Sequence, residues 1–213
     1  MFKSLLALTF LAVSVAAAPA GKSMKCEPVG DARKLWTIAQ TPDHKMAPAR
    51  KTAFKIADHA VNGEQYPRLL ADNSTSDQFQ FYECFNAGSK FEKSSSQKAL
   101  GQVRSTSKSG HCVTAACPWT SPSDNQHHEK DTEKCAVKIQ PCATKDSEEL
   151  RGQWFSMPKG GFGVQYSPLV HEGYSSDEAL PVLEFQKDYA VFLYTKENDS
   201  YSPRPYLSNK ADL

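Results

Sequence analysis

The sequence lacks an excess of charge of either sign, and beyond residue 20 it lacks an apolar run of membrane length. Lysine and arginine number 25 against 24 aspartates and glutamates, so the formal net charge is +1. Such a chain has no charge surplus to drive binding to nucleic acid or anionic lipid. A membrane-spanning helix needs roughly 20 apolar residues. We therefore expect neither a membrane anchor nor a nucleic-acid partner.

Catalytic motifs are also lacking. The serine-hydrolase pattern Gly-x-Ser-x-Gly does not occur. His127, His128, Glu129 and Asp131 lack the helical spacing of a zinc protease, which argues against a metal site. An even number of cysteines leaves no obvious thiol nucleophile. We predict a protein that is not an enzyme and holds no cofactor, with an extracellular hydrolase that uses two carboxylates as the alternative.

The first 20 residues follow the order of a secretory signal peptide. Lys3 precedes an apolar run of about ten residues, and small residues suitable for cleavage follow between Ala16 and Ala20. This predicts a secreted, extracellular protein. The remaining residues 21–213 suffice for one domain and are too few for two well-filled cores. We expect that domain to be monomeric.

Six cysteines lie beyond this segment, in a chain that would pass through an oxidising compartment: Cys26, Cys84, Cys112, Cys117, Cys135 and Cys142. An even count in that setting predicts disulfides, for which fifteen pairings are possible. Residue numbers of facing positions in an antiparallel pair have a constant sum. Pairing Cys112 with Cys142 and Cys117 with Cys135 gives similar sums, 254 and 252. These nested bridges suit one ladder and leave Cys26 for Cys84.

Two sequons can accept an N-linked glycan in a secreted chain. They begin at Asn73 and Asn198. An unmodified surface loop is the alternative at each position.

Sustained helical periodicity is absent from the mature chain, whereas short alternating runs bounded by turn residues recur. We therefore predict an all-β fold with long loops. The expected strands are Thr52–Ala57, Phe79–Cys84, Gly101–Arg104, His111–Ala116, Cys135–Gln140, Phe162–Tyr166, Leu180–Gln186 and Tyr189–Thr195.

A weak repeat connects residues 79–84 with residues 137–142. Both segments place apolar residues at period two and end in cysteine, at a spacing of 58 residues. Residues 191–196 offer a third copy with lysine in place of the cysteine. Repetition of a unit of about 50 residues predicts a closed, pseudo-symmetric β structure.

Residues 101–155 resemble one repeat of the ricin-B-type β-trefoil lectins, in the diverged form carried by secreted fungal proteins. The resemblance lies in the segments Gly101-Gln102-Val103, Lys108–Thr114, Cys135–Cys142 and Gly152-Gln153-Trp154. It extends loosely to residues 68–84. It implies a single β-trefoil-like barrel, with a carbohydrate as the expected ligand.

The chain departs from the family pattern at the sugar site. The family aspartate after the first cysteine is missing from Cys112-Val113-Thr114, and Gln153 is adjacent to Trp154 instead of separated from it by one residue. Losing the carboxylate removes an acceptor for sugar hydroxyls. We interpret Trp154 as a core residue. Trp119 is the candidate aromatic contact, with Thr114 and Gln153 as polar candidates and a role for Trp119 in covering the barrel end as the alternative.

The sequence thus predicts a secreted binding protein for a glycan or cell-wall polysaccharide. A hydrolase inhibitor or host-directed effector on the same scaffold is the second hypothesis, because the polar loop 118–134 could bind an extracellular protein.

Overall fold

The computed structural model describes residues 23–39, 50–61, 63–72, 77–88, 91, 93–116, 135–161, 163–166, 180–186, 189–195 and 204–208. The predicted signal peptide, both sequons, Trp119 and the histidine cluster at 127–128 lie outside the described residues. So does Cys117.

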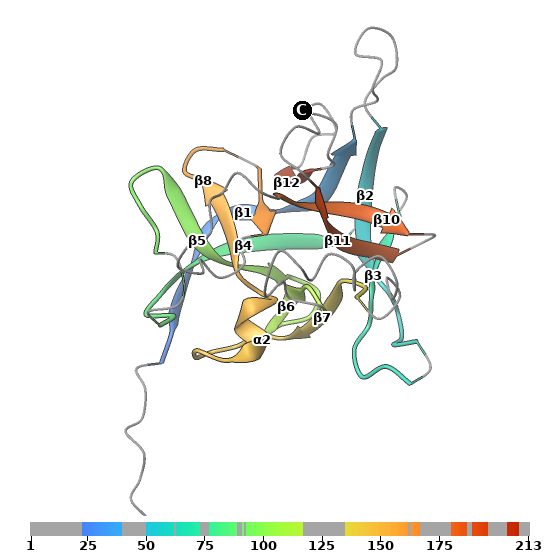
Figure 1. The fold of residues 1–213 in the computed structure, drawn as a ribbon, viewed down its shortest axis with the longest axis horizontal. Helices are drawn as coiled ribbons and strands as arrows, with labels where there is room; N and C mark the ends of the chain where they lie inside the picture. Colours follow the sequence, from blue (N-terminus) through green and yellow to red (C-terminus); the bar gives the residue numbers. More distant parts are fainter. Residues whose placement is uncertain are drawn as a thin grey trace, which may run out of the picture.

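The described residues are mainly antiparallel β-strands with one short helix (Figure 1). The strands are β1 (Lys25–Ala39), β2 (Arg50–Ile56), β3 (Leu69–Ala71), β4 (Gln78–Phe85), β5 (Lys98–Ser105), β6 (His111–Thr114), β7 (Lys138–Pro141), β8 (Phe155–Pro158), β9 (Gln165–Tyr166), β10 (Leu180–Gln186), β11 (Tyr189–Thr195) and β12 (Arg204–Ser208). The helix is α2 (Glu148–Arg151), which lies at the same end of the molecule as β6 and β7 in Figure 1.

The strands form a strongly curled sheet in which β1 is the organising element. The first half of β1 pairs with β4, and its second half pairs with β2 and β12. β4 then pairs with β5, β5 with β8, and β8 with β9. Three hairpins stand beside this series, formed by β2 with β3, β6 with β7, and β10 with β11. Every one of these pairings is antiparallel.

The three hairpins meet one another through their second strands. The Leu69 N–H donates to the Val137 carbonyl at 2.8 Å, and the Val137 N–H donates to the Ala190 carbonyl at 2.8 Å. Tyr189 of β11 is paired with Leu70 of β3. The starts of β3, β7 and β11 thus contact each other in a closed triangle.

All eight predicted strands overlap observed ones, and β10 and β11 have the predicted bounds. Four strands were not predicted: β1, β3, β8 and β12. In β1, Pro28 and Gly30 conceal the strand pattern, because the register shifts between Val29 and Arg33 and Gly30 takes a φ of 66° within that bulge.

Two features differ from the expected all-β, repeating fold. Glu148 and Glu149 begin the short helix α2, where the Ser147 hydroxyl accepts the Leu150 N–H and caps the helix. The 58-residue repeat matches β4 with β7, yet these strands have different neighbours. β4 lies between β1 and β5, whereas β7 belongs to a hairpin. The repeat therefore does not relate equivalent strands.

Two of the three predicted disulfides lie entirely within the described residues, and both are formed. Cys26 and Cys84 face each other across β1 and β4, and the bridge from Cys112 to Cys142 connects β6 to the end of β7. Facing residues of β6 and β7 sum to 252, as for Val113 with Ile139, which is the register that the Cys117–Cys135 pairing requires. Cys135 is disulfide-bonded, and its predicted partner is outside the described residues.

The main core fills the inside of the curl. Alternate residues of each strand point inward, as Phe79 and Phe81 do on β4 and Phe155 does on β8. Each of these side chains is at most 1% exposed. Burying one large aromatic side chain contributes roughly 2–3 kcal/mol, so this cluster is the main source of stability.

Gly101 allows β4, β5 and β8 to approach closely. It pairs with Glu83 on one side and Phe155 on the other. A Cβ atom at this position would overlap the Tyr82 carbonyl oxygen. The backbone contact therefore requires glycine here.

We predict that Gly101→Ala lowers the free energy of unfolding by at least about 2 kcal/mol, because strand backbones cannot yield to the added methyl group. Gly161→Ala is the matched control, since its Cβ would come no closer than 3.2 Å to the side chain and 3.4 Å to the carbonyl oxygen of Pro158. That control should cost at most about 1 kcal/mol. Urea unfolding monitored by tryptophan fluorescence measures both, and equal losses would contradict the close-approach explanation.

Candidate functional site

A second, smaller core lies on the outer face of β4 and β5. Tyr82, Cys84 and Leu100 have the opposite strand parity to the inward-facing residues, so they point away from the main core. Helix α2 and its neighbours cover them, with Trp154 packed on Phe91 at a ring-centroid distance of 5.1 Å. Trp154 is 2% exposed, which confirms its interpretation as a core residue.

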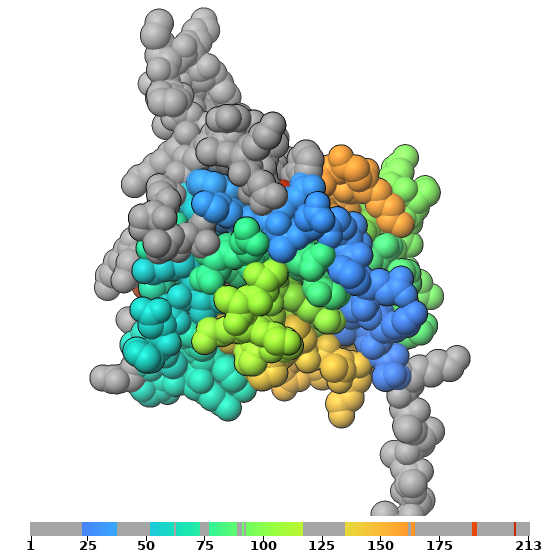
Figure 2. Space-filling model, turned by 180° about the vertical axis from the view of Figure 1, so that it is seen from behind, coloured from blue at the N-terminus to red at the C-terminus, as the bar shows by residue number. Residues whose placement is uncertain are grey.

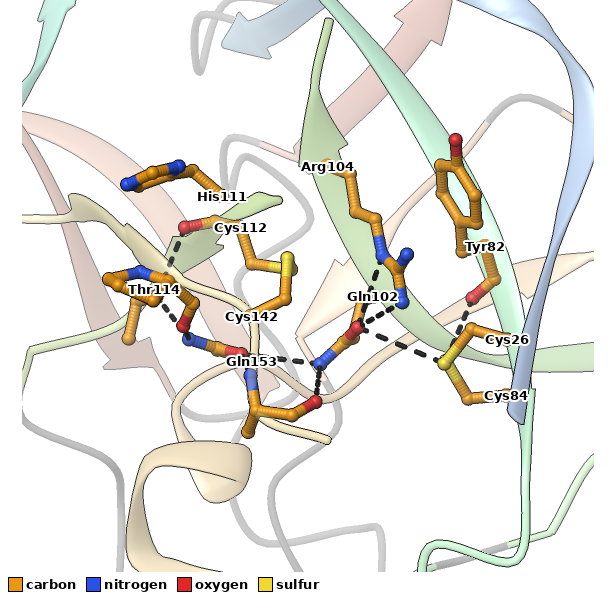
Figure 3. The surroundings of a disulfide bond; sticks show 12 residues. Cys26, Tyr82, Cys84, Gln102, Arg104, His111, Cys112, Thr114, Cys142 and Gln153 are labelled. Carbon is orange, nitrogen blue, oxygen red and sulfur yellow. Dashed lines mark hydrogen bonds between the residues drawn. A yellow bond between two sulfur atoms is a disulfide. The ribbon is translucent and has the colours of Figure 1, made fainter. Parts of the chain in front are cut away.

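Two buried glutamines connect the sheet to this covering segment (Figure 3). Gln102 Nε2 donates to Gln153 Oε1 at 3.2 Å and to the Ala143 carbonyl at 2.9 Å. Gln153 Oε1 also accepts the Ala143 N–H at 2.8 Å, and Gln153 Nε2 donates to the Pro141 carbonyl at 3.0 Å. Both glutamines are fully buried. Such side chains are stable in an interior only when they are hydrogen-bonded.

The hydrogen bonds of this network run in one direction. Arg104 donates to Gln102 Oε1 from Nη2 at 2.8 Å and from Nε at 3.2 Å. At the other end, Gln153 Nε2 donates to Thr114 Oγ1 at 3.0 Å, and Thr114 donates to the Cys112 carbonyl at 3.1 Å. A guanidinium can only donate, so Arg104 fixes the orientation of both amides. The network extends from one disulfide to the other, because Cys26 Sγ lies 3.8 Å from Gln102 Oε1.

The structure brings together two of the three predicted sugar-contacting residues, but in the interior. Thr114 is 3% exposed and Gln153 is unexposed. Both donors and both acceptor sites of the Gln153 amide are used within the protein. These two residues therefore have a structural role in this structure and present nothing to a ligand. Trp119, the third, lies outside the described residues.

At the Arg104 end, the network reaches the surface of β4 and β5 and continues into a group of polar and aromatic side chains. We call it the Arg104 platform, made of Gln80, Tyr82 and Arg104. Gln80 faces Arg104 across β4 and β5, and the guanidinium lies over the Tyr82 ring at 4.2 Å from its centroid. In Figure 3 the Arg104 side chain lies between Gln102 and this ring. All three platform residues are half-buried.

Electrostatics distinguish Arg104 from ordinary surface arginines. Partial burial lowers its pKa below the ordinary value of an arginine, because desolvation disfavours the charged form. A guanidinium nevertheless stays charged in proteins. Among the residues that the structure describes, no carboxylate forms an ion pair with Arg104. The platform thus holds a partly desolvated positive charge that contacts, among the described residues, the Gln102 amide oxygen and the Tyr82 ring.

The predicted site residues did not include Arg104, Tyr82 or Gln102. Gln102 and Arg104 lie within a predicted strand, and period two places them on one face. That pattern could have grouped them. It could not show that α2 and its neighbours bury Gln102, because those residues come from 41 or more positions further along the chain.

A second arginine stacks on a tyrosine, but it has a counterion. Arg68 lies over Tyr189 at 5.0 Å and donates to Glu64 from Nε at 3.0 Å and from Nη2 at 2.9 Å. Lys138 approaches the same carboxylate at 3.3 Å. The hydrogen bonds from Arg68 hold the pKa of Glu64 below its ordinary value of 4.5. This cluster joins residues that precede β3 to β7, at the triangle where the hairpins meet.

The described residues contain no group of three or more histidine, cysteine or acidic side chains placed to bind a metal ion. None of the described helices is long and apolar enough to cross a membrane. Comparison of the chain with protein-family models, with curated proteins and with solved structures finds no match.

We predict that Gln153→Leu lowers the free energy of unfolding by about 3 kcal/mol, because it leaves the Ala143 N–H and the Pro141 carbonyl without their partner and removes one of the two acceptors of Gln102 Nε2. The exposed Gln97 provides the matched control, and Gln97→Leu should change stability by no more than about 0.5 kcal/mol. Urea unfolding compares the two. A similarly small effect of Gln153→Leu would show that the network contributes little.

We also predict a pH-dependent role for Glu64. Its lowered pKa means that the ionised form stabilises the fold, fully above pH 4.5 and progressively less as pH falls through the lower folded value. Glu64→Gln should cost about 2–3 kcal/mol at pH 7, and the difference from the natural protein should narrow below pH 4.5. Thermal unfolding from pH 7 to pH 2 tests this, with the exposed Glu27→Gln as control. A constant difference across this range would refute the linkage.

Proposed function

We propose that this protein is a secreted, non-enzymatic glycan-binding protein on a β-trefoil-like scaffold. The observation that carries the proposal is the strand pairing. A trefoil combines a ring of paired strands with three hairpins related by a pseudo-threefold axis. The series β12, β1, β4, β5, β8 and β9 resembles an open form of such a ring, and the three hairpins that meet through β3, β7 and β11 resemble its triangle, which supports the proposal.

Secretion is supported by the agreement of two independent features. The N-terminus has the order of a signal peptide, and the mature chain contains disulfides Cys26–Cys84 and Cys112–Cys142. Disulfides of this kind form and persist in oxidising compartments. Both features fit an extracellular protein.

Two observations support a glycan as the ligand: the resemblance to ricin-B-type lectins and the partly exposed side chains on the outer face of β4 and β5. Sugar recognition needs aromatic or planar groups and a few fixed polar atoms. Since Thr114 and Gln153 are buried, we assign recognition to surface groups instead. The Arg104 platform supplies an aromatic ring, a planar guanidinium and an amide on one surface, and Trp119, outside the described residues, stays the other aromatic candidate.

A glycan array and a pull-down with cell-wall polysaccharides test this function. The natural protein, secreted with its disulfides intact, should bind a subset of glycans saturably, and the reduced and denatured protein should bind none. Trp119→Ala should weaken binding about 10-fold or more if this aromatic stacks on a sugar ring. Absence of binding across a broad panel would reject the proposal, and retention of a hydrolase or another extracellular protein would favour the interaction-module hypothesis.

A further inference from the structure

We propose that Arg104 binds the oxyanion of an acidic glycan, such as the carboxylate of a uronic acid or a sulfate ester. This inference rests on the proposed glycan-binding function and specifies the ligand class. It makes the platform residue Arg104 the principal contact for the charged group of the sugar.

The geometry leaves Arg104 prepared to accept an anion. Two of its five N–H groups are fixed on Gln102 Oε1, at 2.8 and 3.2 Å. The Tyr82 ring covers one face of the guanidinium. Gln102 is itself fixed by Gln153 and Ala143, so the guanidinium plane is held before any ligand arrives. A planar guanidinium with donors remaining matches an oxyanion in bidentate geometry, and little side-chain entropy remains to be lost.

Comparison with Arg68 shows what is missing at Arg104. Both arginines are removed from full solvent and stack on a tyrosine. Arg68 has the Glu64 carboxylate as its counterion, whereas within the described residues Arg104 has only the neutral amide of Gln102. Buried charges in proteins are normally paired. An external anion would give Arg104 the partner that Glu64 gives Arg68.

The net charge of the chain favours recognition of an anionic sugar by the one guanidinium of Arg104 over general electrostatic attraction to polyanions. With a formal net charge of +1, the protein has no broad field that would gather nucleic acid or highly charged polymers. Recognition by one guanidinium instead discriminates a sugar that carries one suitably placed oxyanion from its neutral counterpart. The remaining platform groups, Gln80 and the Tyr82 hydroxyl, lie beside it on β4 and offer hydrogen bonds to sugar hydroxyls.

Isothermal titration with three defined oligosaccharides tests the inference. An oligogalacturonate provides carboxylates, its methyl ester provides the same sugars without charge, and a carrageenan oligosaccharide provides sulfates only. We expect one of the two acidic ligands to bind at least 10-fold more tightly than the methyl ester, which also identifies the oxyanion source. Arg104→Gln should reduce that affinity about 10- to 100-fold, because a charge-assisted bidentate contact is lost. Arg104→Lys should retain only part of it.

Lys34→Gln is the matched control. Lys34 is also a half-buried cation over an aromatic ring, 5.9 Å from the Trp36 centroid, but it belongs to β1 and lies outside the platform. Figure 2 shows β1 in blue on the opposite face from the view of Figure 1, together with the yellow-green residues around the β5–β6 turn. This variant should leave affinity for the acidic ligand unchanged. Thermal unfolding of each variant verifies that the fold is retained.

Failure of this inference can be separated from failure of the proposed function. If the protein binds neutral glycans and Arg104→Gln does not alter affinity for acidic ones, the glycan-binding function stands and the role of Arg104 is rejected. If no glycan binds, titration with sodium sulfate, observed at the Gln102 side-chain amide by NMR, decides about the oxyanion site itself. No saturable shift would reject that site, and a saturable shift without glycan binding would reject a glycan as the source of the oxyanion.

Discussion

The contact between the Gln102 and Gln153 amides is the constraint on which the outer layer of this protein depends. It joins β5 to the segment that carries α2, in a region from which water is excluded. An unpaired amide there would cost about 1–3 kcal/mol, so each glutamine holds the other in place. The one-way order of donors, from Arg104 to the Cys112 carbonyl, fixes both amide orientations. The outer layer is thereby attached to the sheet in one arrangement.

The two disulfides strengthen this arrangement from either side. Cys26–Cys84 ties β1 to β4 beside Gln102, and Cys112–Cys142 ties β6 to the start of the covering segment beside Gln153. The bridges close loops of 58 and 30 residues and so reduce the entropy of the unfolded chain. In the loop-entropy description, each bridge thereby raises the free energy of unfolding by about 3–4 kcal/mol. The small outer core thus needs less apolar area than an unbridged layer of its size.

Local patterns predicted much of this fold, and contacts between distant segments account for most of what they did not predict. Alternating residues identified β4, β10 and β11, and the sum rule for antiparallel pairs identified the Cys112–Cys142 bridge. β1 was not predicted, because Pro28 and Gly30 interrupt the strand pattern. They lie at a bulge that is recognised only from the pairing of β1 with β4. Thr114 and Gln153 were predicted as polar contacts for a sugar, whereas the structure buries both side chains and bonds them to each other. That burial depends on α2 and its neighbours, which no local pattern places.

The fold needs a hydrogen-bond donor at position 104, but it does not need the positive charge of Arg104. Arg104 is half-buried and has no carboxylate partner in the part of the chain that the structure describes, which is costly for a guanidinium. The sheet could bury a neutral residue at position 104 with less desolvation. Arg104 does orient Gln102, but a neutral donor could also satisfy an amide oxygen. The positive charge itself is therefore not required by the network, in contrast to Arg68, whose charge balances Glu64. Under the proposed function, the oxyanion of the ligand supplies the partner for this charge.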